Sequence, residues 1–125
     1  MISKNTENIH EDLRGKLISL SGKNFNIKIK RTFIIYSKKS GIIRGNHAHK
    51  KCRQILCLLN GSASVKLIKK NTKPKSILFN KIGMTIDVKP KNWLNIKLIK
   101  KNTIILVLCN REYEKNDYIY DIKKL

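Results

Sequence analysis

The sequence predicts an all-β protein of short antiparallel strands, arranged as a sandwich, a barrel or a jelly roll. Apolar side chains alternate with polar ones at a period of two, which is the spacing of a strand buried on one face. Turn signals separate these runs at the intervals of small all-β domains, and no stretch has the period of a long helix. The 125 residues suffice for one domain, spanning residues 1–125.

Six segments carry the hydrophobic pattern of strands. Two of them, residues 55–59 and 104–109, are apolar on both faces and are predicted to be inner strands of a sheet. Over the whole chain we expect about nine or ten short strands. The four alternating segments are Phe25–Ile29, which opens a longer segment ending at Tyr36, Val65–Leu67, Met84–Val88 and Ile96–Leu98.

Turn signals lie between these segments. Asn60-Gly61 is typical of a two-residue turn and predicts a hairpin between the strands that flank it. Lys69–Ser76 is a polar loop, and Lys100–Thr103 is a second tight turn. Residues 37–41 separate the long second strand from the following segment, and residues 112–117 could form one short helical turn.

The formal charge of +20, from 28 Lys and Arg against 8 Asp and Glu, first suggests a polyanionic partner. However, 23 of the cations are Lys and 5 are Arg, and Asn and Ile, which share A/T-rich codons with Lys, are also abundant. Aromatic residues make up 6% and are not interleaved with the basic ones. We therefore expect a solvated basic surface rather than a nucleic-acid interface.

The hydrophobic and cysteine patterns indicate a cytoplasmic protein without a membrane span. No apolar run reaches the roughly 18 residues that a span needs, and residues 1–16 lack the apolar core of a signal peptide. Three cysteines (Cys52, Cys57 and Cys109) without a CxxC motif argue against a disulfide framework and a zinc knuckle. Reduced thiols in the core are expected.

The chemistry of the chain is concentrated in the tripeptide His47-Ala48-His49. Residues i and i+2 of a strand point to the same face, so both imidazoles are expected to enter one space. From Gly41, the spacing through His47, His49, Gln54 and Gly61 resembles the first motif of the cupins, G-x5-H-x-H-x3-4-E-x6-G, with Gln54 in place of the Glu. This resemblance implies a cupin-type antiparallel jelly roll, or double-stranded β-helix.

The residues argue against a catalytic metal and against any cofactor. The second cupin motif should supply another His after a Pro, but residues 90–95 contain none. Two His and a neutral amide are a poor ligand set for a catalytic metal. The imidazoles of His47 and His49 are instead available for acid–base work near neutral pH.

The segment Arg44–Lys50 (RGNHAHK) resembles the RGxHAHK signature of the nucleotide-sugar 3,4-ketoisomerases, the small WxcM-like (FdtA/QdtA-type) cupins. Other landmarks follow in the same order: D-x-R-G-x-L at 12–17, I-K-R at 29–31, Trp93, and Y-x-x-x-D-Y-I at 113–119. The resemblance covers nearly the whole chain, from about residue 10 to 125. Two positions depart from the family pattern, Leu94 after the Trp and Phe33 after I-K-R.

The resemblance implies an isomerase that acts on dTDP-4-keto-6-deoxyglucose, in the biosynthesis of deoxyamino sugars for lipopolysaccharide or another surface glycan. His47 would be the base and His49 its partner or proton shuttle. Arg14 resembles the members that form the galacto product, and small cupins of this family pair as homodimers, often exchanging N-terminal strands. The residues expected to bind substrate are Arg44, Arg14, Gln54, Trp93 and Lys50.

Three alternatives remain open from the sequence. A related dTDP-sugar epimerase would add a His–Asp dyad and an acidic Tyr, and we expect no Asp of that kind beside the His pair. A catalytically impaired cupin could serve as a sugar-nucleotide-binding module, as Leu94 and Phe33 allow. Nucleic-acid binding would rest on charge alone.

Overall fold

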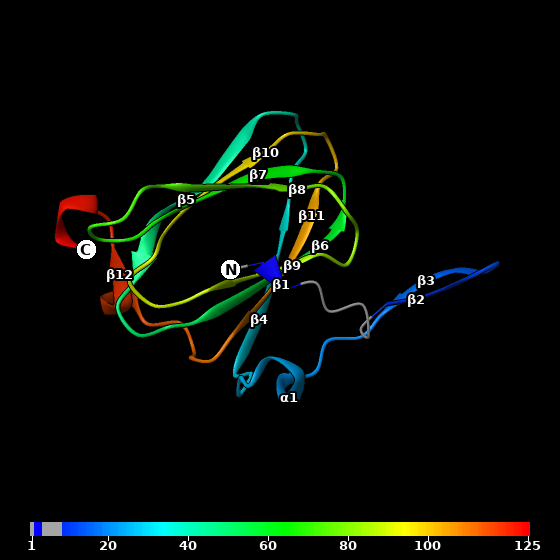
Figure 1. The fold of residues 1–125 in the computed structure, drawn as a ribbon, viewed down its shortest axis with the longest axis horizontal. Helices are drawn as coiled ribbons and strands as arrows, with labels where there is room; N and C mark the ends of the chain where they lie inside the picture. The colour runs from blue at the N-terminus through cyan, green and yellow to red at the C-terminus, as the bar shows by residue number, and fades with distance from the viewer. Residues whose placement is uncertain (1, 4–8) are drawn as a thin grey trace.

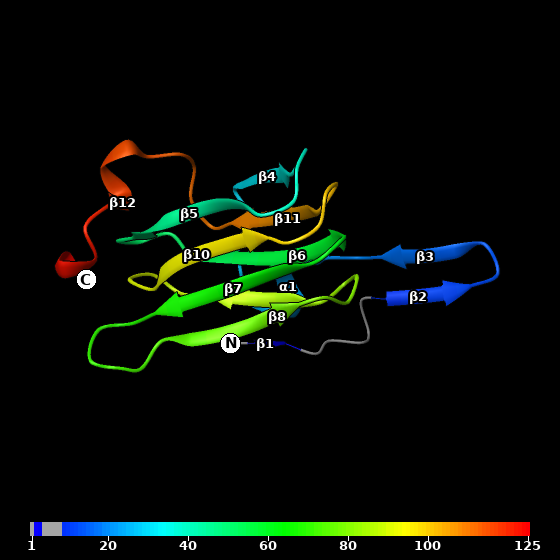
Figure 2. The ribbon, with the colours of Figure 1, turned by 90° about the horizontal axis from the view of Figure 1, so that it is seen from above.

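The computed structural model describes residues 2–3 and 9–125 and has the predicted antiparallel jelly roll (Figures 1 and 2). One five-stranded sheet has the order β1-β9-β6-β11-β4 and faces a second with the order β12-β5-β10-β7-β8. The strands are β1 (Ile2–Ser3), β2 (Ile9–Asp12), β3 (Gly15–Ile18), β4 (Arg31–Tyr36), β5 (Ile42–His49), β6 (Gln54–Asn60), β7 (Ala63–Ile68), β8 (Lys75–Phe79), β9 (Thr85–Val88), β10 (Trp93–Leu98), β11 (Ile104–Cys109) and β12 (Tyr118–Ile119).

The described residues thus form twelve strands, more than the nine or ten predicted. The two fully apolar runs became β6 and β11, which are inner strands as expected. Within residues 2–3 and 9–125, the short helical elements are α1 (Gly22–Phe25) and the 3₁₀ turns η2 (Lys115–Asp117) and η3 (Ile122–Lys124). The expectation of no signal peptide falls in part on residues 1 and 4–8, which lie outside the described residues.

From β4 onward the chain crosses from one sheet to the other after every strand except β7, which pairs with β8 in the same sheet. The prediction of a hairpin at Asn60-Gly61 is therefore wrong, because β6 and β7 belong to different sheets and do not pair. The turn instead packs against the loop between β10 and β11. The Asn60 side chain donates to the Asn102 carbonyl oxygen, and the Thr103 hydroxyl accepts the Ser62 N–H and donates to the Ser62 carbonyl oxygen. A side chain at Gly61 would collide with Thr103, so glycine is required at this crossover.

The main core lies between the sheets, and a second apolar cluster lies outside. The segment from Phe25 to Ile29 is not a strand, because α1 ends there and Asn26 takes a left-handed conformation with φ 50°. Phe25 and Ile27 instead pack on Ile55 of β6 and Leu108 of β11, on the outer face of their sheet. This second layer explains why β6 and β11 are apolar on both faces.

The β2–β3 hairpin projects from the body of the molecule, at the end opposite β12 and the C-terminus (Figures 1 and 2). Leu13 at its turn and Leu17 on β3 are exposed. Among the described residues, no helix is long and apolar enough to cross a membrane.

Candidate active site

The site begins with an irregularity in β5. The pairing of β5 with β10 shifts between Leu94 and Asn95, so that Asn46 of β5 is bypassed between Gly45 and His47. Gly45 and Asn46 both have positive φ, of 89° and 60°. A Cβ on Gly45 would lie 2.6 Å from the Leu94 carbonyl oxygen, so the bulge requires glycine there. The extra residue lets Arg44 and His47, three positions apart, line one cavity.

This cavity, of about 690 Å³, opens between β4, β5 and β10. Its polar lining comes from Arg44, His47, Gln54 and Tyr118, and much of the rest is apolar. Of the predicted site residues, the fold therefore brings Arg44, His47 and Gln54 together. The apolar and aromatic part of the wall comes mainly from Phe33, Ile35, Tyr36, Ile43, Leu56, Leu94, Ile96 and Val107.

His47 presents a basic nitrogen at this wall. Its Nδ1 lies 3.1 Å from the Gly45 carbonyl oxygen, which can only accept a hydrogen bond. Nδ1 therefore carries the proton, and Nε2 keeps the free lone pair of a base. Burial, and then the neighbouring His49, lower the pKa of His47 below its ordinary value of 6.5. The imidazole is accordingly neutral at pH 7.

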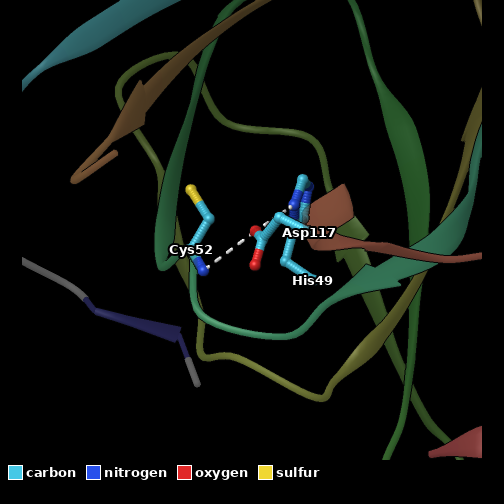
Figure 3. Close-up of side chains that lie close together, drawn as sticks. All are labelled: His49, Cys52 and Asp117. Carbon is cyan, nitrogen blue, oxygen red and sulfur yellow. Dashed lines mark hydrogen bonds and ion pairs between the residues drawn. The ribbon is translucent and has the colours of Figure 1, made fainter. Parts of the chain in front are cut away.

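His49 lies behind His47 and forms a buried dyad with Asp117 (Figure 3). The two imidazole rings meet edge to face with their centres 5.1 Å apart. His49 Nδ1 donates to Asp117 Oδ2 at 3.0 Å, which leaves Nε2 as the basic nitrogen. No described partner reaches this Nε2, although it is fully buried. Burial lowers the pKa of His49 and the Asp117 carboxylate opposes that effect, with a net decrease.

The loop between β5 and β6 fixes the Asp117 carboxylate. Asp117 Oδ1 accepts the backbone N–H of Lys51 at 2.8 Å, and Oδ2 accepts that of Cys52 at 3.2 Å. The backbone N–H of Lys50 also donates to the Asp117 carbonyl oxygen. With these contacts the carboxylate cannot turn away from His49, and it holds the imidazole in one tautomer.

Tyr118 was not among the predicted site residues, yet it completes the polar wall. It pairs with His49 in the β12–β5 ladder, and its ring centre lies 4.4 Å from that of His49 and 5.0 Å from that of His47. Burial raises the pKa of the phenol, although a hydrogen bond from Arg31 partly offsets this. Tyr118 therefore stays protonated at neutral pH and can donate a proton.

Three predicted substrate-binding residues do not line the cavity. Trp93 precedes Leu94 on β10, and the alternation of the strand directs Leu94 and Ile96, not Trp93, to the cavity. Lys50 is exposed beyond the His pair. Arg14 lies on the projecting hairpin, where its guanidinium bonds the Asp12 carboxylate.

The expectation that no Asp stands beside the His pair is wrong, since Asp117 does so. Asp117 is 68 residues from His49 in the sequence, so local spacing could not reveal the contact. The signal in the sequence that marks this residue is the C-terminal D-Y-I landmark at 117–119.

The donors near the dyad do not fit a metal ion well. Ligand atoms of His49, Cys52 and Asp117 lie within 4.8 Å of one another. However, both Asp117 oxygens already accept hydrogen bonds, and Figure 3 shows the Cys52 sulfur directed away from the carboxylate. A cation would have to break these contacts. The cluster is better described as a hydrogen-bonded support for His49.

Comparison with known proteins finds enzymes that are similar to this chain. TDP-4-oxo-6-deoxy-alpha-D-glucose-3,4-oxoisomerase of Aneurinibacillus thermoaerophilus is 34% identical over 109 residues, 86% of this chain and 78% of that protein. A 3,4-ketoisomerase from Helicobacter canadensis has 32% identity and a TM-score of 0.84, covering 93% of this chain and 87% of that one.

A third relative is QdtA, a sugar 3,4-ketoisomerase from Thermoanaerobacterium thermosaccharolyticum, in complex with TDP. It has 30% identity and a TM-score of 0.85, and the match covers 93% of this chain and 88% of that one. The family model described as FdtA, WxcM-like, C-terminal matches residues 3–125. Because this match covers nearly the whole chain, the chain belongs to the FdtA (WxcM-like, C-terminal) family.

Proposed function

We propose that this chain is a sugar 3,4-ketoisomerase that converts dTDP-4-keto-6-deoxyglucose to a dTDP-3-keto-6-deoxyhexose without a metal or other cofactor. One observation carries the proposal: the free Nε2 of neutral His47 at a cavity wall, with a carboxylate-held His49 behind it. The relatives named for this reaction support the choice of substrate. We place the reaction in the cytoplasm, in the making of deoxyamino sugars for a surface glycan.

The reaction moves a carbonyl from C4 to C3. His47 Nε2 takes the C3 proton, which the neighbouring carbonyl acidifies, and the electron pair forms an enediolate with negative charge on O4. A proton passes from O3 to O4, and C4 then receives a proton as the C3 carbonyl forms. His49, or Tyr118 with its ring centre 4.4 Å from that of His49, exchanges protons with these oxygens.

Arg44 and Gln54 bind the sugar or diphosphate from within the same chain. Arg14 lies at the opposite end of the molecule, so it can serve a cavity only if a second copy supplies it (Figure 2). We therefore propose a homodimer in which the β2–β3 hairpin of one subunit reaches the other. Its exposed leucines, Leu13 and Leu17, would be covered in that contact. Trp93 and Lys50 are proposed to contact the outer part of the nucleotide.

We propose dTDP-3-keto-6-deoxygalactose as the product. Arg14 matches the members that form this isomer, and apolar Leu94 at the cavity wall leaves sugar orientation to Arg14 and the histidines. The product is trapped by enzymatic amination at C3, and the coupling between H4 and H5 is measured. A small coupling supports the galacto configuration, whereas a large axial–axial coupling contradicts it.

The decisive test of the activity is incubation with the 4-keto substrate in deuterated water, followed by NMR of the sugar. We expect a new hydrogen or deuterium on C4 and loss of the C3 proton. Both changes should be abolished in His47→Asn and retained in Lys70→Asn, an exposed position in the loop between β7 and β8. An unaltered spectrum would contradict the proposal.

A dTDP-sugar epimerase is the second candidate, because the His49–Asp117 dyad and Tyr118 supply the groups that epimerase chemistry uses. The same spectra separate the two activities. An epimerase keeps the carbonyl at C4 and exchanges hydrogen at C3 or C5, whereas the ketoisomerase places a hydrogen on C4.

A further inference from the structure

Two of the three buried thiols lie near the dyad, and the backbone N–H of one of them, Cys52, bonds Asp117. Cys52 is in the loop between β5 and β6, and Cys109 ends β11, where it pairs in register with Gln54. Cys52 and Cys109 belong to the same buried cluster, although 57 positions separate them in the sequence. The third thiol, Cys57, is fully buried further along β6. The reaction proposed above uses none of the three.

Polar groups surround the Cys109 sulfur. The Arg31 guanidinium approaches it at 3.7 Å from β4, and Gln54 Nε2 donates to it at 3.6 Å. The Cys52 thiol itself lies 3.6 Å from the Arg53 carbonyl oxygen. The neighbouring Cys52 side chain first, then Arg31 and Gln54, lowers the pKa of Cys109 to about 6 against the effect of burial. The Cys109 side chain in turn raises the pKa of Cys52. Cys109 is therefore the more acidic of two neighbouring thiols.

Cys57 has a different environment. Burial raises its pKa to about 11, so it stays a neutral thiol. Because the thiolate is the reactive form of cysteine, the chain holds one activated sulfur with a second sulfur beside it and a third that is inert. This is the arrangement of an oxidisable cysteine with a resolving partner.

We propose that Cys52 and Cys109 are a modification site at which hydrogen peroxide, or another small peroxide, produces a reversible intramolecular disulfide. The Cys109 thiolate attacks one peroxide oxygen, so an S–O bond forms, the O–O bond breaks and hydroxide leaves. The Cys52 sulfur then attacks the sulfenic acid, and water leaves with the Cys52 proton. Two sulfurs are oxidised and one peroxide is reduced.

The cavity provides the route for the oxidant. Gln54 lines the cavity and also bonds Cys109, so a molecule the size of water that enters is one side chain from the sulfur. The disulfide would draw Cys52 toward β11. Because the Cys52 backbone N–H holds Asp117 Oδ2, this movement loosens the support of His49 (Figure 3). Loss of turnover on oxidation rests on the proposed function, whereas disulfide formation does not.

The test treats the reduced chain with hydrogen peroxide, blocks the remaining thiols, and measures intact mass and a peptide map. We expect the loss of two hydrogen atoms and one cross-link, Cys52 to Cys109, both reversed by dithiothreitol. Cys52→Ala and Cys109→Ala should each abolish the cross-link, and the matched Cys57→Ala should retain it. If wild type forms no such cross-link, or if Cys57 reacts equally, the proposal is overturned.

Turnover of the oxidised chain distinguishes disulfide formation from the effect of the disulfide on the dyad. A cross-linked chain should lose most of its activity and regain it with dithiothreitol, in wild type and in Cys57→Ala alike. A cross-link with unchanged turnover would refute its coupling to the dyad. If the reduced chain has no ketoisomerase activity, the proposed function fails, and the mass measurement still decides the modification.

Discussion

Asp117 and His49, 68 residues apart in the sequence, share a buried hydrogen bond of 3.0 Å from the imidazole Nδ1 to the carboxylate Oδ2. The backbone of the β5–β6 loop holds the carboxylate, and the carboxylate in turn holds the imidazole. The β5–β6 loop therefore fixes the tautomer of His49 through Asp117.

Asp117→Asn should reduce kcat by about 10²-fold or more while KM changes little. The amide can offer an N–H to His49 Nδ1, which then favours the tautomer with its proton on Nε2 and removes the basic nitrogen. Steady-state kinetics and ¹⁵N NMR of the imidazole measure the two effects. Asp121→Asn, whose carboxylate accepts the backbone N–H of Lys123 in η3, is the control. A tautomer that does not change in Asp117→Asn would contradict this role.

Both histidines should be neutral across the neutral pH range. Burial places the pKa of each below 6.5, so kcat/KM should be level above that value and decrease at lower pH, as His47 takes up a proton. Between the folded and unfolded pKa values the unfolded chain binds more protons. The free energy of unfolding should therefore also decrease as the pH falls below 6.5. A loss of activity with its midpoint above 6.5 would contradict the assignment.

Activity should survive removal of metal ions. Asp117 is occupied by hydrogen bonds and Gln54 is a neutral amide bound to Cys109, so the site offers a poor ligand set. Turnover is compared before and after exhaustive treatment with EDTA, with elemental analysis of both samples. Loss of turnover that zinc or iron restores would show that the acid–base account is wrong.

Mixed subunits test the exchange of the β2–β3 hairpin. Arg14→Ala and His47→Asn should each be nearly inactive, but mixing them under conditions that exchange subunits should restore about a quarter of wild-type activity. Half of the random dimers are mixed, and half of the cavities in those dimers combine an intact His47 with an intact Arg14. Light scattering should show a dimer at micromolar concentration. No recovery after proven exchange would place Arg14 outside the partner's cavity.

The Arg53–Asp87 ion pair should contribute to stability. Arg53 donates to both Asp87 oxygens at 2.9 and 2.7 Å and to the carbonyl oxygens of Phe25 and Asn26, so it ties the α1 segment to the sheet. Arg53→Gln should lower the free energy of unfolding by about 2–4 kcal/mol, because half-buried acceptors lose their donor. Glu114→Gln, which breaks the more exposed pair with Arg111, should cost at most about 0.5 kcal/mol. Urea denaturation measures both.

The sequence predicted the all-β class from its period-two alternation and turn spacing. It predicted the inner strands because β6 and β11 are apolar on both faces, a pattern that only a doubly covered strand needs. It failed at Phe25–Ile29, where the same alternation belongs to an irregular segment that packs with Phe25 and Ile27 on the outside of a sheet. It also failed at Asn60-Gly61, since a turn motif specifies a bend but not which strands will pair.

The sequence predicted those site residues that lie close together along the chain. His47 and His49 could be placed on one face from two residues' separation, and Arg44 joined them because of a bulge whose Gly45 is visible in the sequence. Asp117 and Tyr118 could not be placed this way, because β12 reaches the pair only through the tertiary fold. Trp93 follows the alternation of β10, in which Leu94 and Ile96 face the cavity, so its place was open to a period-two reading. Arg14 could not be placed, because it lies on a projecting hairpin that local spacing does not reveal.

The passage of the chain from sheet to sheet affects how fast the protein folds. Apart from the β2–β3 and β7–β8 hairpins, the strands that pair are distant in sequence, as β4 is from β11 and β5 is from β10. Much of the loop-closure entropy must therefore be lost before these ladders form. This high contact order favours folding on the scale of milliseconds to seconds, typical of all-β domains. Asp117 lies just before β12, the last strand of the chain, which pairs with β5. A nascent polypeptide therefore has no His49–Asp117 dyad until Asp117 has left the ribosome.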